Sequence, residues 1–316
     1  MLVSILIPCF NAERWIAQAI QSALAQSWPH KEVIVIDDGS TDGSLEVIKS
    51  FEGRIQWESG PNRGSNPARN HLLALAEGTW VQYLDADDYL LPGKIVAQMR
   101  CLEDGAGADV IYGPCLLEHS GTGGEKRERL PIPEPRDPWV LLARWFLPQT
   151  GAALWKKAAI VDVGGWREDQ PACQEHELYL RLLMAGKQFR YCHDAGAVYR
   201  QWSENTLWRA DKGRTRRLRL EIIDRLETYL GEHQQLTAER HWAINQSRFE
   251  TARIAWVVDR DEARNIVNAI RHSDRSFVPA GDAARRSYRL LYRWLGFAAV
   301  ETLAAWRRHL FGASPR

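Results

Sequence analysis

Short apolar runs and helical stripes alternate along the first 110 residues of the chain. Three continuous apolar runs are typical of strands buried on both faces, at residues 2–7, 32–36 and 79–84. Residues 12–26 and 67–77 instead carry apolar side chains at the spacing of an amphipathic helix. This alternation predicts an α/β fold of the Rossmann-like type, with a mostly parallel sheet flanked by helices.

The pattern changes in the middle of the chain. Residues 118–138 combine Gly, Pro and charged side chains without periodicity, and we interpret them as a mobile loop. A helical period returns at residues 175–185 and again beyond about residue 203. We therefore expect two domains, an α/β domain at residues 1–204 and a basic helical region, rich in Trp and Arg, at residues 205–316.

Composition and charge narrow the class of protein. The 316 residues are 45% hydrophobic and 26% charged, which excludes a disordered chain. The net charge of +1 and the lack of a recognisable binding motif disfavour nucleic acid as a partner. Five scattered cysteines, no basic leader and no run of about 18 uncharged apolar residues favour a cytoplasmic protein without a membrane span.

Polar side chains directly follow three of the predicted strands. These are Phe10-Asn11, Asp37-Asp38 and the acidic run at residues 85–88. Because the carboxyl ends of parallel strands share one edge of a sheet, ligands bind in the crevice outside that edge. Carboxylates gathered there repel each other, so either they diverge or a cation lies among them. A helix-capping turn is the alternative interpretation of residues 37–42.

Asp85-Ala86-Asp87 is the sharpest of these features. Two carboxylates separated by one residue, directly after an apolar strand, can both face a hard divalent cation. Mg²⁺ and Mn²⁺ prefer oxygen ligands, and one or two carboxylates together with substrate phosphate oxygens often hold them. The pattern predicts a divalent metal, Mn²⁺ or Mg²⁺, beside a phosphorylated substrate.

Four motifs in this order resemble those of a family 2 glycosyltransferase with the GT-A fold. They are Pro8-x-Phe10-Asn11, the run from Val35 through Asp37 and Asp38 to Asp42, Asn62-Arg63-Gly64 with Ala68-Arg69-Asn70, and the run from Tyr83 to Asp88. The resemblance covers about residues 1–200. It implies an inverting transferase with a nucleotide-diphosphate sugar as donor, expected to be a UDP sugar, and a divalent metal.

The resemblance also implies roles for individual positions. The nucleotide and its sugar would contact Pro8, Phe10, Asn11, Asp37, Asp38, Arg69, Asp85 and Ala86, and Asp87 would hold the metal. An aromatic ring can stack on a base, and a carboxylate can accept the imide N–H of uracil. A surface ion pair is the alternative interpretation of Arg69.

A later segment resembles the part of the family that carries the catalytic base. In Gln174-Glu175-His176, Glu175 falls on the position of the Asp that takes the acceptor hydroxyl proton. His176 is an alternative base. A helix N-terminus with favourable acidic residues is the structural alternative.

The acceptor side would include Trp166, Gln174 and Trp202, with Trp155 nearby. Trp202 stands where many relatives of this kind carry a His. If that His helps to hold the metal or the diphosphate, Trp202 cannot replace it, and His193 is the neighbouring candidate ligand. The resemblance leaves the acceptor open: a hydroxyl of a glycan, of a lipid-linked carrier or of another molecule.

The rear of the chain is basic and apolar at once. Residues 205–316 contain 21 Lys and Arg against 13 Asp and Glu, although the whole chain is nearly neutral. Residues 290–306 are strongly apolar but include Arg293 and Glu301, so they are unsuited to span a bilayer. Either this helix lies peripherally at the inner face of the cell membrane, or it docks on the catalytic domain or forms an oligomer contact.

Three other functions remain to be weighed against the transferase. A phosphohydrolase of the haloacid dehalogenase type also uses Asp-x-Asp after a strand, but it needs a hydroxyl residue where Tyr89 stands. A nucleotide-sugar-binding protein without catalysis would account for Gln174 and Trp202. A dinucleotide oxidoreductase is disfavoured, because Pro8-Cys9-Phe10-Asn11 occupies the place of a glycine-rich phosphate loop.

Overall fold

The computed structural model describes the chain except for residues 104, 106, 122–123, 135, 195, 202–210, 282 and 312–316. The described chain forms two compact units. Unit 1 comprises residues 1–142 and 146–215, and unit 2 comprises residues 143–145 and 216–316. The boundary expected between residues 204 and 205, like Trp202, lies outside the described residues.

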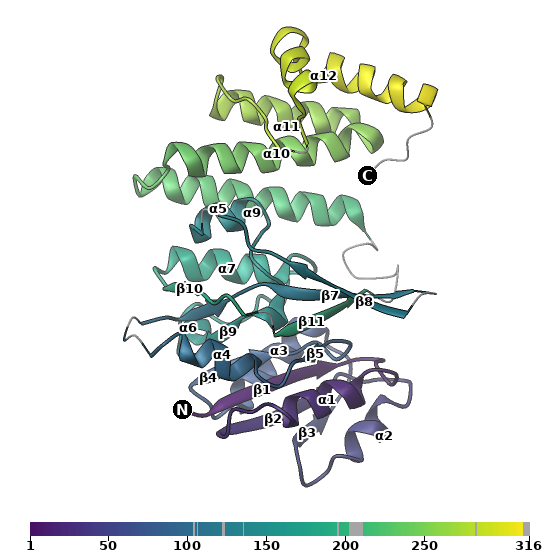
Figure 1. The fold of residues 1–316 in the computed structure, drawn as a ribbon, viewed down its shortest axis with the longest axis vertical. Helices are drawn as coiled ribbons and strands as arrows, with labels where there is room; N and C mark the ends of the chain where they lie inside the picture. Colours follow the sequence, from purple (N-terminus) through teal and green to yellow (C-terminus); the bar gives the residue numbers. More distant parts are fainter. Residues whose placement is uncertain are drawn as a thin grey trace. The chain divides into compact units, whose positions relative to one another are not determined.

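Unit 1 is built on a seven-stranded sheet (Figure 1). Its strands, in spatial order, are β10 (Phe189–Tyr191), β6 (Val110–Tyr112), β9 (Leu154–Lys156), β4 (Trp80–Tyr83), β1 (Val3–Cys9), β2 (Lys31–Asp37) and β3 (Gln56–Ser59). The four strands from β4 to β3 are parallel, whereas β9 runs antiparallel to both of its neighbours. The expected, mostly parallel α/β sheet is confirmed.

Helices flank this sheet and supply the apolar surface that covers it. They are α1 (Ile16–Leu24), α2 (Ser44–Lys49), α3 (Ser65–Leu75), α4 (Lys94–Arg100), α6 (Lys157–Asp162) and α7 (Gln174–Met184), with α5 (Pro138–Ala143) and the 3₁₀ turn η1 (Thr150–Ala152) between β8 and β9. Strand β1 is buried along residues 3–7, which explains why its sequence is continuously apolar. Buried parallel strands of this kind fix the positions of the residues that follow them.

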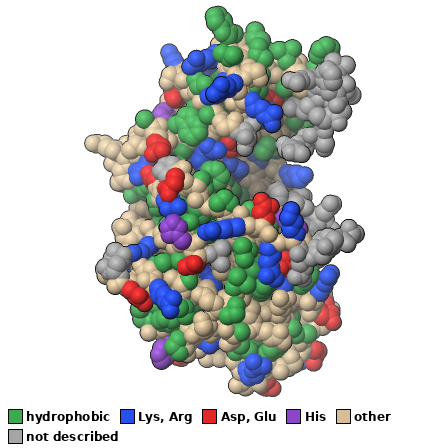
Figure 2. Space-filling view, viewed as in Figure 1, with side chains coloured by type: hydrophobic (Ala, Val, Ile, Leu, Met, Phe, Trp, Pro, Cys, Tyr) green, Lys and Arg blue, Asp and Glu red, His purple; other side chains and the backbone are tan. Residues whose placement is uncertain are grey.

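A second, four-stranded sheet corrects the expected loop at residues 118–138. Its order is β5 (Tyr89–Leu90), β11 (Ala197–Gln201), β7 (Cys115–Gly121) and β8 (Gly124–Leu130), and β7 and β8 form an antiparallel hairpin. The loop prediction was wrong because β8 carries charged side chains on exposed positions, which hides the strand period. Figure 2 shows side chains of both charges mixed over the surface around these elements.

Unit 2 is helical, as expected for the rear of the chain. Helices α9 (Lys212–Glu232), α10 (Ala238–Val258), α11 (Arg260–Ser273) and α12 (Arg286–Phe311) follow one another (Figure 1). The ring of Phe249 lies at the centre of its aromatic core. Residues 143–145 also belong to this unit, and Arg144 forms an ion pair of 2.8 Å with Glu250 of α10.

Candidate functional site

The carboxyl ends of β1, β2 and β4 lie side by side at one edge of the large sheet. The amide of Asp38 donates to the carbonyl of Cys9 at 2.8 Å, and that of Leu84 donates to Leu6 at 2.9 Å. These bonds continue the strand pairing just past β2 and β4. The polar residues after the three strands therefore share one edge.

The first acidic pair is buried and holds neighbouring backbone in place. Asp37 is 1% exposed and accepts a 2.8 Å hydrogen bond from the Ser59 hydroxyl. The two oxygens of Asp38 accept the amides of Arg63 and Gly64, each at 2.8 Å. A carboxylate has about four acceptor positions, so these bonds leave capacity for a ligand. Both residues thus fasten the segment before α3 to the edge.

The turn after β1 presents an aromatic ring to solvent. Phe10 is 49% exposed, in contrast to the half-buried Pro8 within β1. Asn11 adopts a left-handed conformation with φ of 49°, and its side-chain oxygen accepts the Thr41 amide at 2.8 Å. Its own amide donates to the Ser40 hydroxyl at 3.0 Å. The turn after β1 is thus hydrogen-bonded to residues 40–41 after β2, and the Phe10 ring remains available for stacking.

The acidic run after β4 passes from partly exposed to buried. The Asp85 side chain is 32% exposed, Asp87 is half-buried and Asp88 is 2% exposed, while Ala86 is buried between them. Burial raises the pKa of Asp88 well above its usual range, and the charges of Asp87 and Asp85 raise it further. Asp88 accepts the amide of Arg200 at 2.9 Å. Asp88 therefore faces inward, and burial disfavours its ionised form.

Arg69 joins this acidic run to the start of α7. Its guanidinium lies 2.9 Å from Asp85 and donates to the side-chain oxygen of Gln174 at 2.7 Å. Arg69 is 6% exposed, and its guanidinium carbon lies 4.8 Å from the ring centre of Trp166. The alternative of a surface ion pair is therefore wrong for Arg69. It is a buried cation shared by two segments of the candidate site.

Glu175 lies one residue further along α7, beside His176. The two side chains are 3.4 Å apart, and the carboxyl side chain is 25% exposed whereas the imidazole is 6% exposed. Burial by itself would raise the pKa of Glu175, but the hydrogen bond and charge of His176, helped by Arg69, hold it below its usual value. Glu175 is thus ionised at neutral pH, which is the state that a general base requires.

Three residues expected on or near the acceptor side have other partners in the structure. Trp166 is 1% exposed and packs edge-on against Tyr83, so its ring supports Arg69 and offers no free face to a sugar. Trp155 is fully buried and stacks on Tyr179. The Gln174 amide contacts the Ser65 hydroxyl at 3.0 Å as well as Arg69. Gln174 thereby links α7 to α3.

Within the described part of the chain, no group of three or more His, Cys, Asp or Glu side chains is placed to hold a metal ion. The exposed His193, the alternative ligand, joins no such group. Asp85 and Asp87 nevertheless repel Asp88, so a cation beside them would lower that electrostatic cost. One or two carboxylates with water and phosphate oxygens are a usual Mg²⁺ donor set. The residues therefore fit a metal that arrives with a diphosphate.

A buried ion pair beneath the acidic run was missed by the sequence reasoning. Arg200 of β11 contacts Glu118 of β7 at 3.1 Å and donates to the backbone carbonyl of Asp87 at 3.1 Å. Tyr89 also donates to Glu118, at 2.6 Å. Hydrogen bonds from Tyr89, Arg127 and Arg200 outweigh burial and lower the pKa of Glu118. The sequence held one signal, an arginine at position 200, two residues before Trp202.

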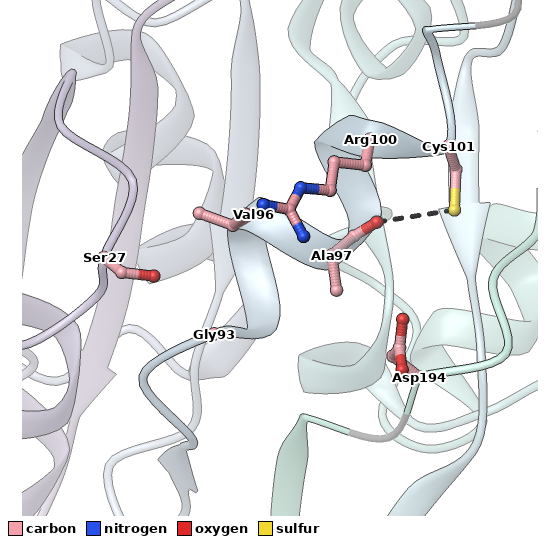
Figure 3. Close-up of a pocket in the computed structure, with 7 residues that line it drawn as sticks. All are labelled: Ser27, Gly93, Val96, Ala97, Arg100, Cys101 and Asp194. Carbon is pink, nitrogen blue, oxygen red and sulfur yellow. Dashed lines mark hydrogen bonds between the residues drawn. The ribbon is translucent and has the colours of Figure 1, made fainter.

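Two surface hollows differ in their relation to this edge. One is lined by Asn11, Ala12, Glu13, Arg14, Trp15 and Asp42, beside the turn that follows β1. The other surrounds α4 and is lined by Ser27, Gly93, Val96, Ala97, Arg100, Cys101 and Asp194 (Figure 3). In the second, Arg100 and Asp194 are the charged side chains, and none of the acidic residues that follow β1, β2 or β4 contributes. Only the first hollow adjoins the candidate site.

The fold and its acidic edge define the class of protein. A parallel core, polar residues after β1, β2 and β4, and a helical C-terminal part are the features of GT-A transferases. Residues 4–160, about half of the chain, match the model of the glycosyl transferase family 2. This part of the chain belongs to that family. The expected fold and family are confirmed, and the phosphohydrolase alternative loses its support.

Relatives with assigned or suggested roles are similar over part of their length. A putative teichuronic acid biosynthesis glycosyltransferase of Bacillus subtilis is 35% identical over 40% of this chain and 51% of its own. A succinoglycan biosynthesis protein of Rhizobium meliloti is 30% identical over 61% of this chain and 60% of its own. The chain thus spans only about half the length of these relatives.

Solved structures extend the likeness of fold beyond the family match. The S. aureus TarS structure of residues 1–349, in complex with UDP-GlcNAc, has a TM-score of 0.58 and 17% identity. The match covers 90% of this chain and 95% of that one. At this level of identity the likeness concerns the fold.

A glycine next to the first acidic pair offers a test of this geometry. Gly39 has φ of +74°, and a Cβ there would lie 2.6 Å from the amide nitrogen of Asn62. Gly53 has a similar φ of +78° but open space around it. We expect Gly53→Ala to cost about 1–2 kcal/mol through backbone strain alone. Gly39→Ala should cost a further ~1–3 kcal/mol, because the clash displaces the segment that Asp38 holds.

Urea unfolding of both variants measures this difference in the free energy of unfolding. Equal losses in the two variants would show that the backbone approach at Asn62 imposes no constraint.

Proposed function

We propose that this protein is an inverting glycosyltransferase that moves a sugar from a UDP-sugar donor to a hydroxyl of an acceptor. One observation carries the proposal: Arg69 binds Asp85 of the Asp-x-Asp segment and Gln174, the neighbour of Glu175. A buried cation thus ties the segment suited to the diphosphate to the segment suited to the base. Donor and acceptor chemistry would meet between them.

The donor would lie along the edge formed by the ends of β1, β2 and β4. Phe10 would stack on the base, with Pro8 and Asn11 shaping the turn, and Asp37 and Asp38 would border the nucleobase pocket. Asp85 and Ala86 would face the ribose or the sugar. The UDP-GlcNAc and UDP complexes of the structurally similar TarS support a uridine nucleotide as the donor carrier.

In the reaction, the acceptor hydroxyl oxygen attacks the anomeric carbon from the face opposite the diphosphate. Glu175 accepts the hydroxyl proton as the new carbon–oxygen bond forms. The bond between the anomeric carbon and the diphosphate oxygen breaks, and its electron pair leaves with the diphosphate. Arg69, which already lies beside Asp85, would stabilise the negative charge that develops on the departing diphosphate. Gln174 positions Arg69 and holds α7 against α3 through Ser65.

Asp87, with Asp85 next to it, would hold a Mn²⁺ or Mg²⁺ ion. When bound, such an ion neutralises charge on a departing diphosphate. Asp88 would hold no ion, because its carboxyl is buried and bonded to the Arg200 amide. Arg200 instead anchors the acidic run through the carbonyl of Asp87.

The acceptor is proposed to be a glycan hydroxyl, free or lipid-linked, with transfer taking place in the cytoplasm. Relatives named for teichuronic acid and succinoglycan biosynthesis support a glycan. Among the described residues, none of the helices has the length and apolar character needed to cross a membrane. Trp202 is retained as a candidate acceptor contact, whereas the buried Trp166 would act through Arg69.

Thermal-shift screening of UDP, GDP and UDP sugars, with and without Mn²⁺, tests the donor class. A ligand at 100 times its Kd adds roughly 2.7 kcal/mol of stability, which is readily detected. Stabilisation by a UDP sugar, followed by UDP release in the presence of an acceptor, is the expected result. A response to simple phosphate esters alone would contradict the proposal, and donor binding without turnover would favour the inactive binding protein.

The role of Glu175 can be tested by removing its charge. We expect Glu175→Gln to lower turnover by about two to four decades while UDP affinity stays near that of the wild type, because only proton transfer is lost. Turnover is followed as UDP release, and UDP affinity by calorimetry. Glu168→Gln, an exposed change in the segment before α7, is the matched control. Retained turnover in Glu175→Gln would assign the base elsewhere.

The role of Asp87 is tested through the metal dependence of binding. Asp87→Asn should abolish the gain in UDP affinity that Mn²⁺ provides, because one anionic ligand is lost. Asp162→Asn, which changes an exposed carboxylate of α6, should leave that gain intact. Calorimetric UDP titrations with and without Mn²⁺ make the comparison. An unchanged Mn²⁺ effect in Asp87→Asn would remove the metal assignment.

The contact between His176 and Glu175 predicts a shift in the pH profile. His176 lowers the pKa of Glu175, so His176→Gln should raise it. A general base loses activity as the pH falls through its pKa, and the acid limb of kcat/KM should therefore move to higher pH. His71→Gln, at an exposed ion pair with Glu58, is the control. An acid limb that stays in place would separate His176 from the base.

A further inference from the structure

Helix α12 exposes a set of large apolar side chains, which the described residues of unit 2 leave accessible. Trp294 is 86% exposed and Trp306 is 67% exposed. We call this set the α12 patch, and it consists of Leu290, Leu291, Trp294, Leu295, Leu303 and Trp306. Figure 2 shows hydrophobic side chains together with Lys or Arg side chains at the α12 end of unit 2. The helix is kinked at Gly296, which has φ of 76°, so Leu303 and Trp306 lie beyond the kink. The other four side chains of the patch precede the kink at helical spacing, and an exposed apolar set of this kind marks an interaction surface.

The one acidic residue of this helix faces away from the patch. Glu301 is 1% exposed, forms an ion pair of 2.5 Å with Arg253 of α10 and accepts the Tyr288 hydroxyl at 2.8 Å. Phe297 and Val300 are also buried, next to it in the helix. The carboxylate of Glu301 therefore points into unit 2, and the exposed surface of α12 carries no negative charge from it.

The charges left on the outer side of α12 are positive. Arg286 and Arg293 are exposed and Arg289 is half-buried. Among the described residues, these three form no ion pair with an acidic side chain. Unit 2 lies in the part of the chain that carries the basic surplus. The patch thus combines Trp and Leu side chains with arginines that lack an acidic counterpart.

We infer that the α12 patch binds the surface of an anionic membrane. Tryptophan side chains favour the boundary between head groups and acyl chains, and each arginine near an anionic surface adds attraction. A symmetric dimer through the same surface is disfavoured, because it would bring identical arginines together without acidic partners. This inference goes beyond sugar transfer and does not depend on which donor or acceptor is used.

Vesicle flotation with the full chain tests the inference. The probes are vesicles of equal parts phosphatidylglycerol and phosphatidylcholine, compared with phosphatidylcholine alone. We expect binding to the anionic vesicles only, and weaker binding at high salt. Replacing Arg286, Arg289 and Arg293 by Gln should weaken it by roughly a hundredfold, taking about fivefold for each charge. Trp294→Ser with Trp306→Ser should also abolish flotation.

Val161→Ser, which removes an exposed apolar side chain from unit 1, is the matched control and should float like the wild type. Circular dichroism and thermal unfolding check that each variant is folded, and the arginine set tests the inference if the tryptophan pair is not. Equal binding to neutral vesicles, or unchanged flotation of the folded variants, would overturn it. So would light scattering showing that the patch variants split a dimer while flotation is unaffected.

Discussion

Repulsion among carboxylates at one sheet edge is the constraint around which this site is organised. Asp85, Asp87 and Asp88 follow β4 within five residues, and burial next to two charges raises the pKa of Asp88. Arg69, which lies on α3, offsets part of this repulsion and also donates a hydrogen bond to Gln174. One buried cation therefore both stabilises the acidic edge and fixes the start of α7. This chain needs such an offset, because its parallel strands bring these acidic ends together.

The acidic residues divide into those that hold backbone and those that remain available for chemistry. Asp38 accepts two amides of the segment before α3, and Asp88 accepts the amide of Arg200 in β11. Asp87 and Glu175 keep partial exposure. The charge of His176 favours the ionised form of Glu175, and the carboxylates next to Asp87 favour a cation beside it. A mutation in the first group is therefore expected to act through geometry, and one in the second group through charge.

The sequence predicted the centre of the large sheet well, because β1, β2 and β4 are largely buried and have continuous apolar runs. It predicted that Phe10 and Asp85 would lie on one edge, since parallel strands place their ends together. The hairpin β7–β8 was missed, because charged side chains on β8 conceal its period. The burial of Glu118 was missed for a similar reason. A carboxylate usually indicates a solvent-exposed position, whereas Glu118 is buried and contacts Arg200 and Tyr89.

The packing of Trp166 could not be predicted for a related reason. Nothing in the sequence distinguishes a tryptophan that stacks on a sugar from one that supports an arginine, since both lie near polar residues. The distinction rests on Tyr83 and Arg69, which are more than 80 residues away along the chain. The roles of the site residues in donor binding and catalysis stay predictions, although their positions on the fold are now described.

Residues 143–145 have a consequence for how this protein can be divided or recombined. They belong to unit 2 although residues 146–215 of unit 1 separate them from the rest of it, and Arg144 forms an ion pair there with Glu250. If the C-terminal helices were exchanged for those of another protein at a single junction near residue 215, residues 143–145 would lose the helices that they pack with. A functional chimera would have to transplant two separate pieces of chain, so we expect the helical region to diversify by gradual substitution more readily than by shuffling.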